Sequence, residues 1–455
     1  MTTAPTIPGD AGQAIALDVD DIQAGALSER PSPYVGRYLL LRVDDPRHGR
    51  ELVRRLAAVA AIGPDTPGSA ADAWTTVAFT YRGLEKLGVP PASLAGFAPE
   101  FREGMAARAQ ELGDVGESSP EHWEEPLGSP DVHVAISVLA PDAARLGAVA
   151  ERARAASDDL GGVEVIWRQD CYQLPSGRTS FGFKDGIGQP DVEGSGRPLR
   201  NPTEEPIKAG EFVLGYPDET GSLPPMPSPD VLGRNGTYLV FRKLHTRVAA
   251  YRRFLRERAA DRAEEELLGA KMVGRWPSGA PLAVAPDGDD PGLGADPARN
   301  NAFRYGDDRR GLKCPAGAHS RRANPRDALE HEMSVDTRLH RMIRRGTSYG
   351  PPLPAGVLDD DDQDRGIIFV FAGTHLDRQF EFVKTQWLND GVFIGTPEEK
   401  DPLVGGSDGH GTFTIPHRPI RRRLTEKPPF VVTRGGDYLF APGLRAMRWI
   451  ADLDT

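Results

Sequence analysis

Residues 181–191 read FGFKDGIGQPD and place one carboxylate between glycines. Because glycine has no side chain, Gly186 and Gly188 allow the backbone to lie close to a flat or bulky ligand. Asp185 would then stand over that ligand, and Pro190 would fix the direction in which the chain leaves. Asp-Gly is also a favoured pair in tight turns. The segment alone is therefore consistent with an ordinary turn and with a carboxylate held in a ligand site.

Two later segments supply other chemically useful groups. Residues 314–327, CPAGAHSRRANPRD, contain His319, and residues 342–352, MIRRGTSYGPP, contain Arg344 and Arg345. A histidine can ligate a haem iron. A carboxylate can move a proton between the two oxygens of peroxide, and an arginine can stabilise the negative charge that develops as the O–O bond breaks. An Asp, a His and an Arg are therefore the set that a haem peroxidase requires.

The three segments, in this order, resemble those of the dye-decolorizing peroxidase family. GFKDG at residues 182–186 is similar to the family's GxxDG motif, residues 314–326 to its proximal-histidine segment and residues 343–350 to its distal-arginine segment. Further similar runs are EFVLGYPDE, GRNGTYLVFRKLH and QFEFVKTQWLNDG. The resemblance covers most of the chain and is greatest to the family's larger bacterial members.

The resemblance implies one haem b per chain and a role for each of three side chains. His319 would ligate the haem iron, Asp185 would be the distal acid–base, and Arg344 would stabilise charge in contact with the haem. Arg344 is preferred to Arg345 because the family's arginine lies two positions before a glycine or asparagine. Carboxylates titrate well below neutrality unless shifted, so activity is expected to favour acidic pH. His319 should donate its other ring N–H to a carboxylate or carbonyl, which the sequence does not identify.

The resemblance implies three further kinds of haem contact: backbone over the haem edge, partners of the propionates, and walls of the distal pocket. In that order the candidates are Gly186, Ile187 and Gly188; Asn324 and Arg326; and one or both of Phe369 and Phe371. The two phenylalanines alternate on an apolar strand, so ordinary core positions are an equal alternative for them.

Each assignment has a rival nearby in the sequence. Asp191 is a second carboxylate in the same loop, although a turn residue is the better interpretation. His331 and His340 follow His319 but lack its CPxxAH setting, and Arg345 is expected to pack or pair elsewhere. Residues 359–364 include five aspartates. They are expected to form a solvated acidic loop, because a calcium loop spaces its carboxylates at alternate positions around a glycine.

Large dyes cannot enter a buried haem pocket, so oxidation at a surface aromatic residue linked by electron hopping is a further expectation. The candidates are Trp387, Tyr349 and Trp276, each of which is equally consistent with a core position. The basic run at residues 418–423 is expected to be a solvated face, in which one or two arginines would be able to meet haem propionates.

The composition excludes several classes of protein. A net charge of −11 over 455 residues argues against nucleic acid, whose phosphates need clustered cations. No apolar run approaches a membrane span, and the first residues lack the features of a signal peptide. Two cysteines are too few for a disulfide framework. We therefore expect a cytoplasmic protein without a membrane partner, either a monomer or a homo-oligomer.

The pattern of elements predicts an α+β fold of two ferredoxin-like domains, with antiparallel sheets and helices. Residues 1–35 form a flexible or wrapping arm in this interpretation. Residues 36–205 form the N-terminal domain with the GFKDG loop, and residues 206–455 form the C-terminal domain, which binds haem beneath that loop. The first domain shows the β-α-β-β-α-β order. Its strands are expected at residues 38–43, 75–80, 132–139 and 163–167, and its helices around residues 52–59, 84–87 and 141–149.

The second domain repeats this pattern more loosely. Strands are expected at residues 211–216, 238–242, 367–371 and 437–440, and helices at residues 248–268 and 377–388. Loops are expected at residues 89–130, 221–229 and 277–300.

These features together predict a haem b peroxidase that uses hydrogen peroxide to oxidise dyes, phenols and, as in some larger bacterial members of the family, Mn(II). A second hypothesis is a non-peroxidatic haem protein that stores haem or removes its iron, which would bind through His319 but tolerate the loss of Asp185. A third is a ferredoxin-like binding module without haem. The presence of both Asp185 and Arg344 favours catalysis.

Overall fold

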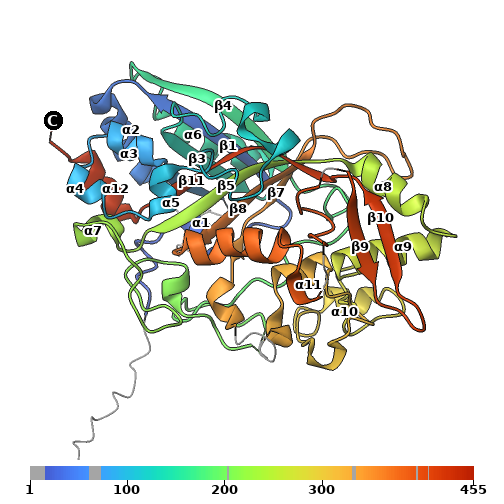
Figure 1. Cartoon of the computed structure of the whole chain (residues 1–455). Helices are drawn as coiled ribbons and strands as arrows, with labels where there is room; N and C mark the ends of the chain where they lie inside the picture. The colour runs from blue at the N-terminus through green and yellow to red at the C-terminus, as the bar shows by residue number, and fades with distance from the viewer. Residues whose placement is uncertain are drawn as a thin grey trace, which may run out of the picture.

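The computed structural model is built around one sheet, in which nine strands of the described chain pair (Figure 1). Eight of them follow the order β4-β1-β3-β2-β11-β5-β8-β6, and β7 pairs with β8 beside this path. Each neighbouring pair is antiparallel. The structure describes residues 16–60, 73–201, 204–329, 335–395, 398–407 and 409–454.

The N-terminal half of the sheet has the predicted ferredoxin-like order. Its elements are β1 (Val35–Val43), α2 (Pro46–Ala60), β2 (Trp74–Phe79), β3 (Val134–Ala140), α6 (Ala143–Ala155) and β4 (Val163–Tyr172). Successive side chains of a strand point to opposite faces. In β1, Leu39 and Leu41 therefore join the core that includes α2, while Tyr38 and Leu40 join a second core on the other face. The four strands predicted for this half are confirmed, with ends that differ by a few residues.

The C-terminal half repeats the same order. Its strands are β5 (Thr237–Thr246), β6 (Ile343–Arg344), β7 (Thr347–Tyr349), β8 (Gly366–Gly373) and β11 (Val431–Ala441). In the strand order β11-β5-β8-β6, the first strand of this half, β5, lies beside its last, β11. In the same way, β1 lies beside β4 in the order β4-β1-β3-β2 of the other half. The two ferredoxin-like units thus share one continuous sheet, and the domain boundary between residues 205 and 206 stays a prediction.

The N-terminal arm closes the seam between the two halves. Strands β2 and β11 share a single backbone pair there, Phe79 with Phe440. Gln23 bridges the rest of the gap, because its Nε2 donates to Val77 O and to Pro442 O at 2.8 Å each. The Val77 N–H donates back to Gln23 Oε1 at 2.8 Å. The described part of the arm therefore wraps against the sheet, which is one of the two forms expected for it.

The long helix expected at residues 248–268 is wrong, because two helices occupy this region. They are α8 (Val248–Arg256) and α9 (Arg262–Val273). Asp261 ends the continuity, since its side chain accepts a hydrogen bond from the Glu264 N–H at 2.9 Å and so caps the start of α9. The helix expected at residues 377–388 is present as two short π-helical segments, η7 (Leu376–Glu381) and η8 (Val383–Leu388).

The strand expected at residues 211–216 is also wrong. This run begins at the end of a 3₁₀ turn, η3 (Ala209–Glu211), and continues as buried loop. Its residues are apolar because the loop is covered. Glu211, which has no exposed surface, pairs with Arg378 at 2.5 Å and receives the Gln379 amide on its carbonyl. A buried loop without sheet pairing thus gives the same apolar run in the sequence as a buried strand.

The other described helices are short, and several fall in regions expected to be loops. They are α1 (Ala24–Leu27), α3 (Tyr81–Lys86), α4 (Pro91–Leu94), α5 (Pro99–Glu103), α7 (Asp230–Gly233), α10 (Pro291–Ala295), α11 (His319–Ala323) and α12 (Leu444–Ala451). The short 3₁₀ turns are η1 (Gly116–Ser118), η2 (Pro120–His122), η4 (Gly306–Asp308), η5 (Arg326–Ala328), η6 (Thr337–His340) and η9 (Phe393–Gly395). A hairpin of β9 (Gly411–Ile415) and β10 (Arg422–Lys427), not foreseen in the sequence, forms a separate small sheet.

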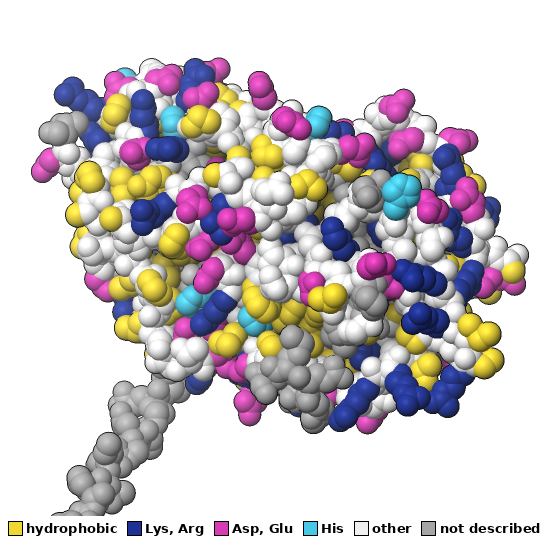
Figure 2. All heavy atoms as spheres, viewed as in Figure 1, with side chains coloured by type: hydrophobic (Ala, Val, Ile, Leu, Met, Phe, Trp, Pro, Cys, Tyr) yellow, Lys and Arg dark blue, Asp and Glu magenta, His cyan; other side chains and the backbone are white. Residues whose placement is uncertain are grey.

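The surface carries charges of both signs (Figure 2). The end of the molecule that bears α9, α10 and the β9–β10 hairpin shows a concentration of Lys and Arg in this view, although the chain as a whole is acidic. Over the ranges that the structure describes, none of the helices combines the length and the apolarity needed to cross a membrane.

Gln23 provides a test of the seam. The substitution Gln23→Ala would leave the Val77 backbone groups and Pro442 O buried without partners, so we expect a loss of about 2–4 kcal/mol of stability. The measurement is the thermal unfolding midpoint. Gln386→Ala removes the same side chain at an exposed position and should leave the midpoint unchanged. Equal midpoints for the two variants would contradict this role.

Candidate active site

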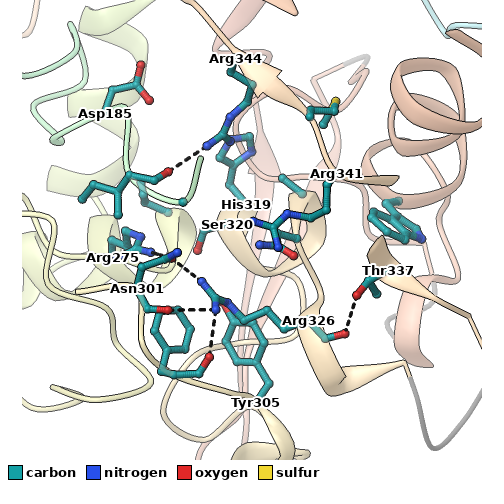
Figure 3. Close-up of a pocket in the computed structure, with 18 of the residues that line it drawn as sticks. Asp185, Arg275, Asn301, Tyr305, His319, Ser320, Arg326, Thr337, Arg341 and Arg344 are labelled. Carbon is teal, nitrogen blue, oxygen red and sulfur yellow. Dashed lines mark hydrogen bonds between the residues drawn. The ribbon is translucent and has the colours of Figure 1, made fainter. Parts of the chain in front are cut away.

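The predicted site residues gather around one cavity between the loop at residues 181–191, helix α11 and strand β6. Its polar part, here the polar lobe, has an empty volume of about 880 Å³. Its lining includes Asp185, Ile187, Gly188, His319, Asn324, Arg326 and Arg344. Segments far apart in the chain thus supply the three predicted groups. Figure 3 shows Asp185, which comes from the loop, Arg344, which comes from β6, and His319, which comes from α11.

A larger, mostly apolar part of the cavity, here the apolar lobe, adjoins the polar lobe. Its empty volume is about 1600 Å³. The two lobes share Lys184, Asp185, Val273, His319, Ala323, Met342 and Arg344. The site is therefore one amphipathic space, with charged groups toward one end, apolar walls toward the other, and the candidate catalytic residues where the two parts meet.

His319 is held from behind by a buried carboxylate. Its Nδ1 donates to Asp401 Oδ2 at 2.9 Å. Asp401 has no exposed surface, and its Oδ1 accepts the backbone N–H groups of Leu403 and Val404 at 2.9 Å each. This arrangement fixes the tautomer and the orientation of the ring, so that Nε2 is left for a ligand in the cavity.

The His319–Asp401 pair also sets the proton affinity of both groups. Burial lowers the pKa of His319, but the charge of Asp401 and its hydrogen bond outweigh this and hold the pKa above its ordinary value. Burial alone would raise the pKa of Asp401. His319 and the two backbone N–H groups outweigh this effect and hold the pKa below its ordinary value, so that the carboxyl stays ionised. The sequence predicted a partner of this kind for His319 without identifying it.

Arg344 is fixed on the opposite side of the cavity by the glycine-flanked loop. Its Nη2 donates to Ile187 O at 2.9 Å, and its backbone N–H donates to Gln189 Oε1 at 3.0 Å. Gly186 and Gly188 have φ angles of +85° and +77°, which favour glycine and give the loop its tight path. Burial lowers the pKa of Arg344, partly offset by the charge of Asp185. Asp185 and Arg344 therefore lie on one face of the cavity and influence each other electrostatically.

The polar lobe is rich in arginine. Arg326 donates to Glu204 Oε1 at 2.7 Å and packs its guanidinium 4.0 Å from the Phe303 ring centroid. Arg275 is buried beside it, and burial lowers its pKa to about 10. Arg341, which the sequence analysis did not select, lines the same lobe and has a buried Nη2 without a hydrogen-bond partner among the described residues. Such groups suit an anionic ligand.

The two candidate phenylalanines of β8 lie in different surroundings. Phe369 lines the apolar lobe. Phe371 has no exposed surface, pairs in register with Arg344 across the β6–β8 ladder, and packs in the main core near Phe380. Phe371 thus occupies the core position that was the alternative for it, and Phe369 is the one of the two that lines the cavity.

The rival residues have partners of their own. Asp191 accepts backbone N–H groups from Arg200 and Asn201 and so shapes its own loop. Arg345 donates to Leu27 O in the N-terminal arm at 3.1 Å. His340 lines the polar lobe, but its ring stacks on the Phe382 ring at 4.1 Å and its Nδ1 bonds to Arg378 O. His331 lies outside the described residues.

The acidic loop at residues 359–364 is organised by basic side chains. Arg365 binds Asp361 and Arg253 binds Asp359. Throughout the described ranges, no cluster of three or more His, Cys, Asp or Glu side chains is arranged to hold a metal ion. The basic run at residues 418–423 lies on and before β10, away from the lining of either lobe.

The aromatic candidates for surface oxidation are all buried. Trp387 is 4% exposed and lines the polar lobe. Tyr349 donates to Asp364 Oδ1 at 3.2 Å, and Trp276 donates to Ala285 O at 2.7 Å. Among the three, Trp387 alone has contact with the cavity.

Comparisons with known proteins give consistent relatives, although no family model matches the chain. The chain is 31% identical to a dye-decolorizing peroxidase from Exidia glandulosa over 395 residues, 82% of this chain and 74% of the relative. It is 29% identical to a multifunctional dye peroxidase from Amycolatopsis sp. over 403 residues, 82% of this chain and 81% of the relative. A solved dye-decolorizing peroxidase in complex with 2,6-dimethoxyphenol superposes with a TM-score of 0.81 at 27% identity, covering 96% of this chain and 100% of the other.

Asp401 provides a test of the geometry behind His319. In cofactor-free protein, Asp401→Asn should lower the pKa of His319 below its ordinary value, because burial would remain while the opposing charge is lost. The measurement is an NMR titration of isotopically labelled histidine. Asp44→Asn removes an equal charge at an exposed position and should leave His319 unchanged. An unaltered titration in Asp401→Asn would contradict the arrangement.

Proposed function

The chain belongs to the dye-decolorizing peroxidase family, and from this premise we propose that it is a haem b peroxidase whose active site is the cavity between Asp185, Arg344 and His319. The observation that carries the assignment of the site is the arrangement of these side chains. A carboxylate and an arginine lie on one side of a single cavity, and a histidine fixed by a buried carboxylate reaches it from α11.

The cavity fits haem by the chemistry of its lining. The apolar lobe, with Phe369 and Met342 among its walls, suits the porphyrin faces, and the arginines of the polar lobe suit two propionates. His319 Nε2 is positioned as an iron ligand. Two further atoms of the polar-lobe residues, Arg341 Nη2 and Ser320 Oγ, are buried without a hydrogen-bond partner among the described residues. A bound propionate would provide an acceptor for them. Haem bound there would supply the redox-active iron at which peroxide is reduced.

The protein's own groups would then act on peroxide in a defined way. Asp185 takes a proton from the first peroxide oxygen and returns it to the second, which becomes the leaving water. Arg344, held by Ile187 O, stabilises the negative charge that develops on the oxygens. The Asp401 carboxylate, bonded to His319 Nδ1, would make His319 a more basic ligand for the iron.

Dyes and phenols are the substrates that the relatives support. The related enzymes are named for dyes, and one of the similar structures holds 2,6-dimethoxyphenol. Mn(II) is a further reductant that the resemblance to bacterial members implies, but the described residues offer no dedicated cluster of ligands for it. A cytoplasmic location is likewise proposed on the sequence alone, and cell fractionation would test it. Monomer and homo-oligomer both stay open as predictions for gel filtration.

The storage or iron-removing alternative uses the same cavity but has no need of the distal pair. Haem could be held by His319 and the arginines of the polar lobe alone. The glycine-flanked loop holds Asp185 and Arg344 over the cavity, which favours the peroxidase, because storage of haem gains nothing from placing these groups there.

Peroxide kinetics test the distal assignment. In haem-loaded protein, Asp185→Ala and Arg344→Leu should each slow the reaction with hydrogen peroxide by about a hundredfold or more, since proton transfer and charge stabilisation have effects of this size. Stopped-flow absorbance at the Soret band is the measurement. Arg344→Lys, which keeps the charge but loses the planar fork, should fall in between. If the wild type reacts no faster than the variants, the distal assignment fails and the iron-removing alternative becomes the better one.

Haem retention tests Arg341 independently of activity. Arg341→Leu should release haem to excess apomyoglobin about three to ten times faster, because a charge-assisted contact with a propionate would be lost. Arg341→Lys should largely restore retention. Arg338→Leu, which removes a nearby arginine paired with Glu219 outside the cavity lining, is the matched control. Release at the wild-type rate from Arg341→Leu would exclude a propionate contact.

A further inference from the structure

A small pocket lies where the N-terminal arm meets the end of the glycine-flanked loop and β6. It is lined by Leu27 and Glu29 of the arm, by residues of the stretch 189–200, and by Ile343 and Arg345. This arm pocket has an empty volume of about 450 Å³ and shares no lining residue with either lobe of the proposed haem cavity. It is therefore a separate space, of a size that suits a small ligand.

Arg345 is the buried charge of the arm pocket. Its side chain is 6% exposed, and its Nη groups donate to Arg344 O at 3.2 Å and to Leu27 O at 3.1 Å. Its Nε is buried without a hydrogen-bond partner among the described residues. Glu29 acts on its charge only from a distance, because the Glu29 carboxylate forms its ion pair with Arg200. Since a buried charge is unfavourable without a partner, the pocket lacks one acceptor and one negative charge beside Arg345.

Two further arginines add positive charge to the same pocket. Arg197 and Arg200 both line it, and Arg197 Nη2 donates to Ser28 Oγ of the arm at 3.0 Å. Burial, together with the charges of Arg200 and Arg197, lowers the pKa of Arg345 to about 9, and Glu29 offsets only part of this effect. Guanidinium groups from two segments of the chain thus surround one space.

The acidic residues of the lining already have partners. Glu29 is paired with Arg200 and is largely exposed, with 60% of its side chain accessible. Asp191 accepts the backbone N–H groups of Arg200 and Asn201. Leu199, which is 51% exposed, also belongs to the lining, so the pocket reaches the surface. The buried part of the pocket is therefore positively charged and open to a small anion from solvent.

We propose that the arm pocket binds a phosphate-sized oxyanion from solvent. The ion accepts the Arg345 Nε–H and forms charge-assisted bonds with Arg197 and Arg200. An ion with several oxygens suits these donors, because they come from two segments and need acceptors in different directions. The Ser195 hydroxyl, which also lines the pocket, can donate to a further oxygen.

The bound ion joins the arm to the residues that position the distal arginine. Gln189 lines the arm pocket and accepts the Arg344 backbone N–H at 3.0 Å. Arg345 follows Arg344 directly and donates to Leu27 O of the arm. An ion on Arg345 therefore fastens the arm, the loop and the end of β6 at one point. This site does not require haem and goes beyond the proposed peroxidase function.

The test is a calorimetric titration of the haem-loaded protein with inorganic phosphate, in chloride buffer of constant ionic strength. Loading with haem fills the arginine-rich polar lobe and leaves the arm pocket as the site under test. Arg345→Met and Arg200→Met each remove one charge of the pocket, and each should weaken phosphate binding by about tenfold or more. Arg42→Met is the matched control, because Arg42 is 36% exposed and paired with Glu164, as Arg200 is 32% exposed and paired with Glu29. It should bind phosphate as the wild type does.

Hydrogen exchange gives the location of the ion. Phosphate should slow amide exchange at residues 27–29 and 191–200 in the wild type, and this protection should be lost in Arg200→Met. No saturable phosphate binding, wild-type affinity in a folded pocket variant, an equal loss in Arg42→Met, or protection confined to segments that line the haem cavity would each overturn the proposal. If Arg345→Met does not fold, Arg200→Met decides the matter, because Arg200 is partly exposed.

Discussion

A buried carboxylate determines the geometry of the whole site. Asp401 has no exposed surface, and an isolated charge in such a place would be strongly unfavourable. Its stability depends on His319 Nδ1 and on two backbone N–H groups, which occupy both oxygens. The same bonds allow only one tautomer and one ring orientation for His319. The direction of Nε2, and with it the place of the iron in the proposed enzyme, therefore follows from how Asp401 is satisfied.

The opposite face of the cavity follows from the sheet. Arg344 is the last residue of β6, at the edge of the nine-stranded sheet, and its side chain is turned toward the cavity and held there by Ile187 O. Phe371, its partner in register on β8, points into the core. Phe369, two residues before Phe371 on β8, lines the apolar lobe, because one end of β8 lies in the main core and the other end borders the cavity.

Local patterns in the sequence were sufficient for elements whose surroundings are local. The apolar run at residues 38–43 predicts a buried strand, and the glycines around Asp185 predict a tight loop. Asp401 was not predictable, because it lies 82 positions from His319 and the fold alone brings the two together. The loop that begins at Glu211 was read as a strand, since burial by neighbouring segments gives the same apolar run as sheet pairing. Arg341 carries no signal in the sequence beyond its charge, and the absence of a partner for its Nη2 among the described residues is a property of the folded cavity.

The bridge made by Gln23 has a consequence for how the chain reaches its native state during synthesis. Pro442, which accepts one of the hydrogen bonds of Gln23, lies 419 positions after it and therefore leaves the ribosome much later. Strand β11 (Val431–Ala441) lies at the centre of the sheet, between β2 and β5, and follows both of them in the sequence. Contacts of such high sequence separation form late and slowly. The nascent protein must therefore carry an unfinished sheet, with the edges of β2 and β5 open, until β11 has been synthesised.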